Sequence, residues 1–501
     1  MSAYRFQVLP AESLAGTSVL LQRGHLIYTL PDGRRCALYA VLARPATSHR
    51  APLVVHAPGG TQTVSNADLE FWVRAGFACV SFDWQHGLFD HDPERKSAWP
   101  EGVVAQSRPF VDWDQFIIPL VIAGLDHLLD WAATVPGVDG TRMGMTGISW
   151  GGYLTWVANA HLPRFRAVVP VYGCGGLFAP GHPCRPTLDP SLARRWARDW
   201  DPLALAARQH APVCWLSGAN DFFGWPRHGD RLCDQLRVAH RRLLAPNLDH
   251  AVPATASALA LAWMRHYLID GPAVPAAPRF LRGGLTVAGG EQVAGIDHWW
   301  TPTPGDDDGR CWHPGLPPVG ACARVAIVRY RDGTALSTGV VALKSRQRAA
   351  ALGTTWPDLR AGLGWRWELG GTQLHGNAVE LSPVAGSWQR LRVRAPAGRQ
   401  SCGVLLRQVA DPRWRGRSLT LALADAAGQP LTGTLHIGAR LAPSRGKRKE
   451  CSGQVAVRRG RLTLSPRTCP FVPRGQWRKL LFLLVNGLPP EVMLGPLTAK
   501  A

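Results

Sequence analysis

Short apolar runs alternate with segments of helical spacing along the first half of the chain. The apolar runs lie at residues 52–56, 77–82, 143–146, 167–172 and 212–216. The helical segments lie at 68–75, 116–133, 153–160 and 256–268. Nearly continuous apolar strands alternating with helices are typical of a parallel sheet covered on both faces. The pattern predicts an α/β domain over residues 1–272, with residues 1–45 as an antiparallel edge.

Beyond a proline- and alanine-rich linker at 271–278, the helical periodicity fades. Two apolar stretches flank Asp332 and Gly333 and form a hairpin pattern at 324–343. Further short strands are predicted at 389–394, 418–424, 432–439, 453–457, 461–464 and 479–485. Turn residues separate them at fairly regular intervals, which is typical of an all-β sandwich or jelly roll. We expect an all-β region over 279–501, as one unit or divided into 279–345 and 346–501.

Positive charge is concentrated in this second half. Residues 273–501 carry 32 lysines and arginines against 13 aspartates and glutamates, so nearly all of the net charge of +21 lies there. Arginine clusters at 413–417 and 445–449 are candidates for binding an anionic polymer, such as an acidic polysaccharide. The alternative is a solvated basic face without a partner. No DNA- or RNA-binding motif stands out.

Length and composition limit the class of protein. A chain of 501 residues predicts two or three domains. No apolar run approaches the roughly 20 residues that span a bilayer, and no secretory leader is visible at the start, so a cytoplasmic location is the default and export stays open. None of the 11 cysteines forms a Cys-x-x-Cys pair, which argues against a zinc ribbon. Two pairs, Cys174 with Cys184 and Cys451 with Cys469, could form disulfide bridges if the protein meets an oxidising compartment.

The candidate chemistry begins at Gly147-Ile148-Ser149-Trp150-Gly151. A Gly-x-Ser-x-Gly motif between an apolar strand and a helix is typical of a nucleophile elbow, in which a sharp turn exposes the serine hydroxyl. The motif alone is weak in a chain with 53 glycines. The order of elements around Ser149 strengthens it.

A serine nucleophile needs a base, and the base needs a group to hold it. Asp221 follows the apolar strand at 212–216, where a carboxylate is expected, and His250 lies on a loop before the helix at 256–268. The order Ser, Asp, His fits an α/β-hydrolase arrangement. Asp249 is a rival carboxylate, but it is next to His250 in sequence and would point elsewhere.

Two backbone N–H groups should stabilise the developing oxyanion. We expect one from Trp150, directly after the nucleophile. The other should come from the loop after the strand at 52–56, from Gly60 or from Thr61, and the sequence does not decide between them.

Residues from about 53 to 266 resemble the α/β-hydrolase superfamily, in the branch of dienelactone hydrolases, acetylxylan esterases and prolyl-oligopeptidase-like enzymes. The segments that carry the resemblance are 147–153, 169–175, 217–222 and His250. The resemblance implies a Ser149–Asp221–His250 triad and a hydrolase without a cofactor or metal. One departure is that Ala57-Pro58-Gly59-Gly60 replaces the usual His-Gly opening of the oxyanion loop.

Tryptophan is abundant, with 21 residues. Trp84 and Trp225 fall near the expected pocket and are candidates for its walls, with core packing as the alternative. Residues 175–201 are a candidate cap. We therefore expect a serine carboxylesterase or deacetylase, with acetylated carbohydrate as the preferred substrate. The alternatives are a peptidase, a lipase-like acyl hydrolase, and a catalytically idle protein that binds carbohydrate or anions.

Overall fold

The chain was analysed as a computed structural model. The structure describes residues 4–9, 19–46, 49–60, 62–85, 92–105, 108–180, 182, 184–246, 248, 250, 252–253, 255–281, 284–301, 312–319, 321–343, 379–383, 389–393, 402–406, 418–441, 449–472, 480–488 and 491–500.

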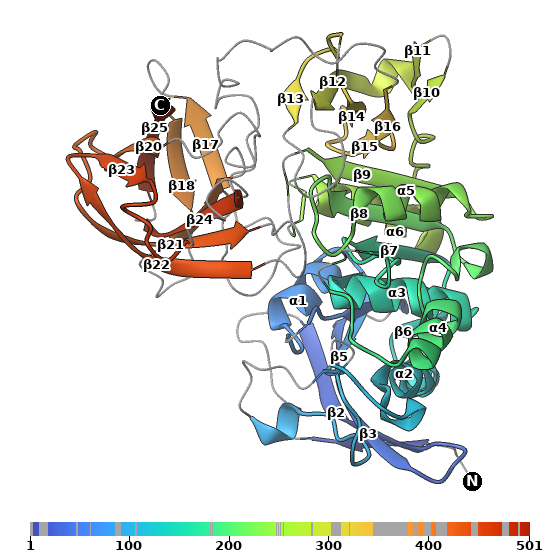
Figure 1. Ribbon diagram of the computed structural model, residues 1–501. Helices are drawn as coiled ribbons and strands as arrows, with labels where there is room; N and C mark the ends of the chain where they lie inside the picture. The colour runs from blue at the N-terminus through green and yellow to red at the C-terminus, as the bar shows by residue number, and fades with distance from the viewer. Residues whose placement is uncertain are drawn as a thin grey trace.

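A mixed nine-stranded sheet forms the centre of the first half (Figure 1). Its strands are β1 (Tyr4–Val8), β2 (Val19–Thr29), β3 (Arg35–Pro45), β4 (Ala51–Ala57), β5 (Ala78–Phe82), β6 (Val138–Ile148), β7 (Ala167–Val171), β8 (Val213–Gly218) and β9 (His240–Ala245). They follow the order β1-β2-β3-β5-β4-β6-β7-β8-β9. The six strands from β5 to β9 are parallel, whereas β1, β2 and β3 pair antiparallel at one edge. The predicted α/β fold is confirmed.

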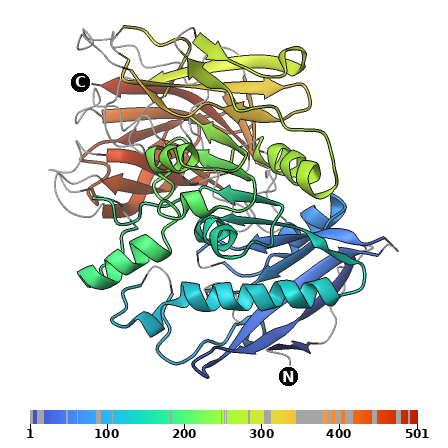
Figure 2. The same cartoon turned by 90° about the vertical axis from the view of Figure 1, so that its right-hand side faces the viewer.

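Helices cover both faces of this sheet. They are α1 (Asn66–Arg74), α2 (Ile117–Thr134), α3 (Trp150–His161), α4 (Pro190–Asp199), α5 (Pro226–Asp234) and α6 (Ala256–Leu268). Short 3₁₀ turns lie at Pro93–Arg95, Trp113–Gln115, Ala206–Arg208 and Gly290–Gln292. One hydrophobic core lies between the sheet and helices α2 and α3, and a second lies between the sheet and helices α1 and α6. Figure 2 shows α2 crossing in front of the amino-terminal strands.

Helix α2 corrects the expectation that no apolar run approaches the length needed to span a bilayer. Among the described residues it is the one helix that is long and apolar enough, by length and composition, to cross a membrane. Its window of 18 residues is 61% buried inside the protein, with side chains such as Leu125 and Leu128 fully covered. The burial follows from its role as a core helix packed on β6.

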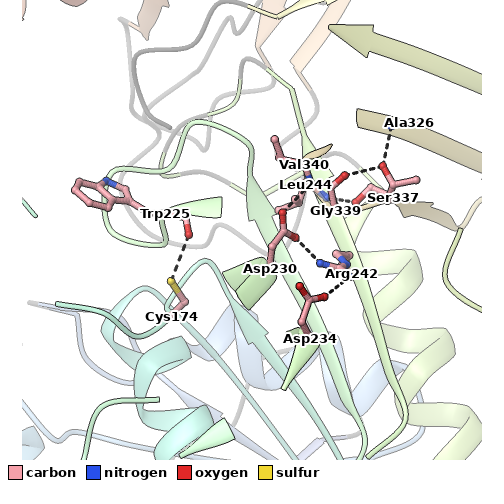
Figure 3. A network of polar contacts seen from close by, with 11 residues as sticks. Cys174, Trp225, Asp230, Asp234, Arg242, Leu244, Ala326, Ser337, Gly339 and Val340 are labelled. Carbon is pink, nitrogen blue, oxygen red and sulfur yellow. Dashed lines mark hydrogen bonds and ion pairs between the residues drawn. The ribbon is translucent and has the colours of Figure 1, made fainter. Parts of the chain in front are cut away.

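A small β unit follows the linker. Its strands are β10 (Arg279–Leu281), β11 (Gly284–Thr286), β12 (Val293–Thr301), β13 (His313–Pro314), β14 (Ala323–Tyr330), β15 (Ala335–Ser337) and β16 (Val341–Ala342). Strand β15 lies against β9, the edge strand of the large sheet, and Leu244 N donates to Ser337 Oγ at 2.8 Å (Figure 3). Side chains such as Leu336 extend the hydrophobic core of the first half into this unit. The small β unit therefore covers the open edge of the central sheet.

A buried ion pair ties the two parts together (Figure 3). Asp230 on α5 pairs with Arg242 on β9, and its other oxygen accepts a hydrogen bond from Val340 N at 2.7 Å. Burial raises the pKa of Asp230 to about 6, and the positive charge of Arg242 opposes this shift. The hydrogen bond from Val340 N therefore joins the small β unit to this pair at the sheet edge. Removing either charged partner would leave an uncompensated buried charge.

The described strands after residue 378 form one antiparallel sheet that curves strongly in Figure 1. They are β17 (Val379–Pro383), β18 (Gln389–Val393), β19 (Cys402–Leu406), β20 (Ser418–Ala424), β21 (Gly433–Leu441), β22 (Lys449–Arg458), β23 (Arg461–Leu464), β24 (Leu480–Leu488) and β25 (Glu491–Lys500). Apolar side chains such as Leu435, Val455 and Leu462 alternate with exposed polar ones. The expectation of an all-β carboxyl-terminal region is confirmed.

Candidate active site

Ser149 sits on a strained turn between β6 and α3. Its backbone has φ 57° and ψ −119°, a left-handed conformation that residues with a side chain rarely adopt. The turn is tight because the Cβ of any larger residue at Gly151 would lie 2.0 Å from the carbonyl oxygen of Ala57. A serine at a helix start usually caps the helix with its hydroxyl, but the Ser149 side chain makes no such bond. The hydroxyl is therefore available for another partner.

That partner is His250. Its Nε2 lies 2.7 Å from Ser149 Oγ, and its Nδ1 lies 2.9 Å from Asp221 Oδ2. Since a carboxylate only accepts, Nδ1 carries the proton, and Nε2 is left to accept the serine proton. The three side chains predicted from the sequence thus form one continuous hydrogen-bonded chain.

Asp221 is completely buried just beyond β8. Its second oxygen, Oδ1, accepts from the backbone N–H of Phe223 at 2.7 Å and of Gly224 at 2.6 Å. Backbone donors stabilise a carboxylate in its charged form and fix its direction. Asp221 can therefore hold one imidazole tautomer without moving.

Aromatic rings enclose His250. The ring centroids of Tyr172 and Phe222 lie 4.3 Å and 4.7 Å from that of the imidazole. Tyr172 follows β7 with φ 40°, so a second strained residue stands next to the elbow. Rings at these distances pack on the imidazole and limit its rotation. Both residues lie in segments that carry the family resemblance, 169–175 and 217–222, but the sequence did not predict their contact with His250.

The loop after β4 lies over the nucleophile. A Cβ at Gly59 would be 3.3 Å from Ser149 Cβ, and a Cβ at Gly60 would be 2.8 Å from Trp150 Cδ1. Gly59 N already donates to Gln62 Oε1 at 3.0 Å. Gly60 thus remains a candidate donor, whereas Thr61 lies outside the described residues. The backbone N–H of Trp150, at the first position of α3, stays the other predicted donor.

Trp84 and Trp225 do not form exposed walls of a pocket. Trp84 is completely buried and donates its indole N–H to Pro58 O at 3.0 Å, so it supports the loop above the nucleophile from below. Trp225 is 2% exposed and lies beneath the guanidinium of Arg227, 4.3 Å from its ring centroid. Both side chains are buried because neighbouring loops cover them, which a local pattern does not encode.

The segment 175–201 is anchored next to the site. Asp201 is buried and accepts a hydrogen bond from Gly176 N, at 2.7 Å for the shorter of two contacts. It also accepts one from Leu177 N at 3.2 Å. Burial raises the pKa of its carboxyl. Near the carboxyl end of the segment, the indole N–H of Trp196 donates to Tyr153 Oη on α3 at 2.8 Å. These contacts fix the segment on α3 and beside Phe223. Its role as a cap stays a prediction.

Within the described part of the chain, no cluster of three or more His, Cys, Asp or Glu side chains could hold a metal ion. The candidate bridges do not form, because Cys174 and Cys184 are not joined, and neither are Cys451 and Cys469. Asp249, the rival carboxylate, lies outside the described residues.

Comparisons with known proteins find relatives for part of the chain. The family profile described as "Acetyl xylan esterase (AXE1)" matches residues 25–175. A relative from Salmonella typhimurium, named for carboxymethylenebutenolidase activity, is 42% identical over 141 residues, which are 27% of this chain and 45% of the relative. An Escherichia coli relative with the same name is 31% identical over 137 residues, again 27% and 45%. The chain thus spans less than half the length of these curated relatives.

Among solved structures, acetyl xylan esterase 1 from Thermoanaerobacterium sp. JW/SL YS485 is similar, with 19% identity and a TM-score of 0.42. The match covers 52% of this chain and 87% of that chain. The resemblance to the α/β-hydrolase superfamily, in the branch of dienelactone hydrolases and acetylxylan esterases, is confirmed for the part of the chain that the family profile and the relatives cover.

Proposed function

We propose that this chain is a serine hydrolase that cleaves carboxylic esters through an acyl-enzyme on Ser149. The observation that carries the proposal is the hydrogen-bonded chain from Ser149 through His250 to Asp221, with contacts of 2.7 Å and 2.9 Å. A resting serine hydroxyl is a weak nucleophile, and a neighbouring neutral imidazole removes its proton as it attacks.

In the proposed reaction, Ser149 Oγ attacks the ester carbonyl while His250 Nε2 takes the hydroxyl proton. The carbonyl oxygen becomes an oxyanion, which the N–H groups of Trp150 and of Gly60 or Thr61 stabilise. The imidazolium then gives its proton to the departing alcohol as the C–O bond breaks. Water, deprotonated by His250, then attacks the acyl-enzyme. The imidazolium returns this proton to Ser149 Oγ as the bond between Oγ and the acyl carbon breaks, which releases the carboxylic acid and restores the resting serine. Asp221 stabilises the imidazolium in both halves of the reaction.

Acetylated carbohydrate is the substrate that we propose within this class. The match to the acetyl xylan esterase family profile over residues 25–175 supports it. The test is hydrolysis of nitrophenyl esters from acetyl to octanoyl, alongside acetylated xylan and aminoacyl amides. We expect the highest kcat/KM for acetyl and release of acetate from xylan. Rising activity with chain length would favour the lipase-like alternative, and preferred cleavage of amides would favour the peptidase.

We also propose that the basic second half binds an acidic polysaccharide. The arginine clusters at 413–417 and 445–449 have side chains outside the described residues, so the support comes from the β22–β23 hairpin. Arg458 and Arg461 are exposed and directly opposite each other in its register. Like charges directly opposite each other across two strands repel, and a bound anion would relieve this repulsion.

The binding test compares retention of the full chain on immobilised polygalacturonate with that of an Arg458→Gln, Arg461→Gln double variant. An Arg74→Gln, Arg208→Gln double variant, at two exposed positions of the first half, is the matched control for the loss of two positive charges. We expect earlier elution at lower salt for the hairpin double variant and little change for the control. Equal elution of the three proteins would mean that the hairpin is only a solvated basic face.

A further inference from the structure

A buried histidine outside the triad contacts the loop that holds Asp221. His182 is 5% exposed and lies in the segment 175–201, where two turns fix its backbone. The backbone N–H of His182 donates to Ala179 O at 3.1 Å, and its backbone carbonyl accepts from Arg185 N at 3.2 Å. The ring packs against that of Trp225 at a centroid distance of 4.8 Å. The side chain is therefore held in one orientation.

The two ring nitrogens of His182 have contacts that assign its tautomer. Cys184 N donates to Nδ1 at 3.1 Å, so Nδ1 is an acceptor and carries no proton. Nε2 lies 3.2 Å from the carbonyl oxygen of Phe223, which can only accept. Both contacts are satisfied by one state, the neutral imidazole with its proton on Nε2.

The hydrogen bond from His182 reaches Asp221 through a single peptide group. The carbonyl of Phe223 and the N–H of Gly224 belong to the same planar, resonance-stabilised unit. Gly224 N donates to Asp221 Oδ1 at 2.6 Å. A donor at the carbonyl end of a peptide polarises its N–H and strengthens the bond that this N–H makes. A hydrogen bond from His182 would therefore orient this peptide and strengthen the hydrogen bond from Gly224 N to the Asp221 carboxylate.

We propose that His182 is a positioning residue for the triad, acting on Asp221 through the peptide between Phe223 and Gly224. The complete chain is His182, this peptide, Asp221, His250 and Ser149. It joins the segment 175–201 to the nucleophile without any contact between His182 and the reacting atoms. The inference rests on the proposed esterase function.

Two amide substitutions separate the two contacts of His182. In His182→Gln, the side-chain N–H₂ can occupy the place of Nε2 and still donate to Phe223 O. In His182→Asn, the shorter amide can occupy the place of Nδ1 and accept from Cys184 N, but it does not reach Phe223. His161→Asn is the matched control, because His161 Nε2 contacts a backbone carbonyl, Asp199 O, at 3.1 Å at the far end of α3.

The measurement is kcat and KM for nitrophenyl acetate, with the melting temperature of each variant. We expect His182→Asn to lower kcat about tenfold with KM within about twofold, because a displaced Asp221 weakens the base without altering ground-state binding. His182→Gln and His161→Asn should stay within about threefold of the unaltered chain. A merely structural role would lower melting temperature without separating Gln from Asn.

Equal kcat in His182→Asn and the unaltered chain, or equal losses in His182→Asn and His182→Gln, would overturn the inference. Neither result would affect the proposed function, since the unaltered chain would remain an esterase. Absence of ester hydrolysis in the unaltered chain would instead overturn the proposed function, and this inference with it.

Discussion

The imidazole Nε2 of His250 lies 2.7 Å from the hydroxyl of Ser149, although 101 positions separate the two residues in the sequence. Strand β6 ends at the serine, and the loop after β9 carries the histidine to the same end of the sheet. Parallel strands bring their carboxyl ends to one edge, where loops from distant parts of the chain can meet. The contact unites a serine on a strained backbone with an imidazole that is already in the accepting tautomer.

Replacing Asp221 with asparagine should nearly abolish turnover while leaving the fold intact. An amide N–H in place of Oδ2 would favour the wrong imidazole tautomer, so we expect kcat to fall by a factor on the order of 10³–10⁴ with a small change in KM. Steady-state hydrolysis of nitrophenyl acetate checks this. Asp297→Asn, at an exposed carboxylate of the small β unit, is the control and should keep full activity. A kcat above a tenth of the unaltered value would exclude the assigned role of Asp221.

Adding a single methyl group at Gly60 should disturb the oxyanion site. The new Cβ would lie 2.8 Å from Trp150 Cδ1, so the loop or the indole must shift. Loss of one oxyanion donor typically costs about 10²–10³ in kcat, and we expect Gly60→Ala to approach this range.

The control for this prediction is Gly290→Ala, where a Cβ meets no atom within 4 Å. Its kcat should equal that of the unaltered chain. If Gly60→Ala also keeps its kcat, Gly60 does not supply the second donor, and Thr61 is the remaining candidate in this loop.

Trp84→Phe tests whether the indole N–H holds the loop above the nucleophile. Phenylalanine keeps a buried ring but leaves Pro58 O without its donor at 3.0 Å. We expect kcat to fall about tenfold with KM nearly unchanged, because the loop carries a transition-state contact. Trp196→Phe, which also removes a buried indole donor, should lower thermal stability with little effect on kcat. Equal kcat values for the two variants would contradict the positioning role of Trp84.

The pH dependence of stability should reveal His228. Burial, aided by the positive charge of Arg227, lowers the pKa of this histidine to about 4. In the unfolded chain its pKa returns to about 6.5, so the unfolded state alone binds the proton between these values. The contribution of His228 is therefore complete above about pH 6.5 and is lost as the pH falls toward 4.

Denaturant unfolding of the unaltered chain and of His228→Gln at pH 7, 5.5 and 4.5 measures this effect. The free energy of unfolding of the unaltered chain should fall more steeply with acidification, by up to about 1 kcal/mol per pH unit, because glutamine does not titrate. Parallel pH profiles would show that protonation of His228 costs the folded state nothing.

The three residues of the proposed triad were predictable because each has a local signal. Ser149 stands in a Gly-x-Ser-x-Gly turn, Asp221 follows an apolar strand, and His250 precedes a helix with clear periodicity. The strand alternation likewise predicted the parallel part of the sheet. These features depend on residues that are close in sequence, where hydrophobic period and turn chemistry are informative.

Features that depend on distant contacts were not predictable. Strand β9 begins with His240, Arg241 and Arg242, a polar start for a strand, and Arg242 is buried against Asp230 of α5. Trp84 was expected on a pocket wall, but its burial depends on the loop after β4. His182 gave no signal, since its partner carbonyl lies 41 positions away.

The most direct test of the central claim is covalent labelling at Ser149. A fluorophosphonate that reacts with activated serines should add one adduct per chain, and peptide mass spectrometry should place it on Ser149. The Ser149→Ala variant, folded by circular dichroism, should take up no label and hydrolyse no nitrophenyl acetate. An adduct on another residue, or equal labelling of both proteins, would contradict the account.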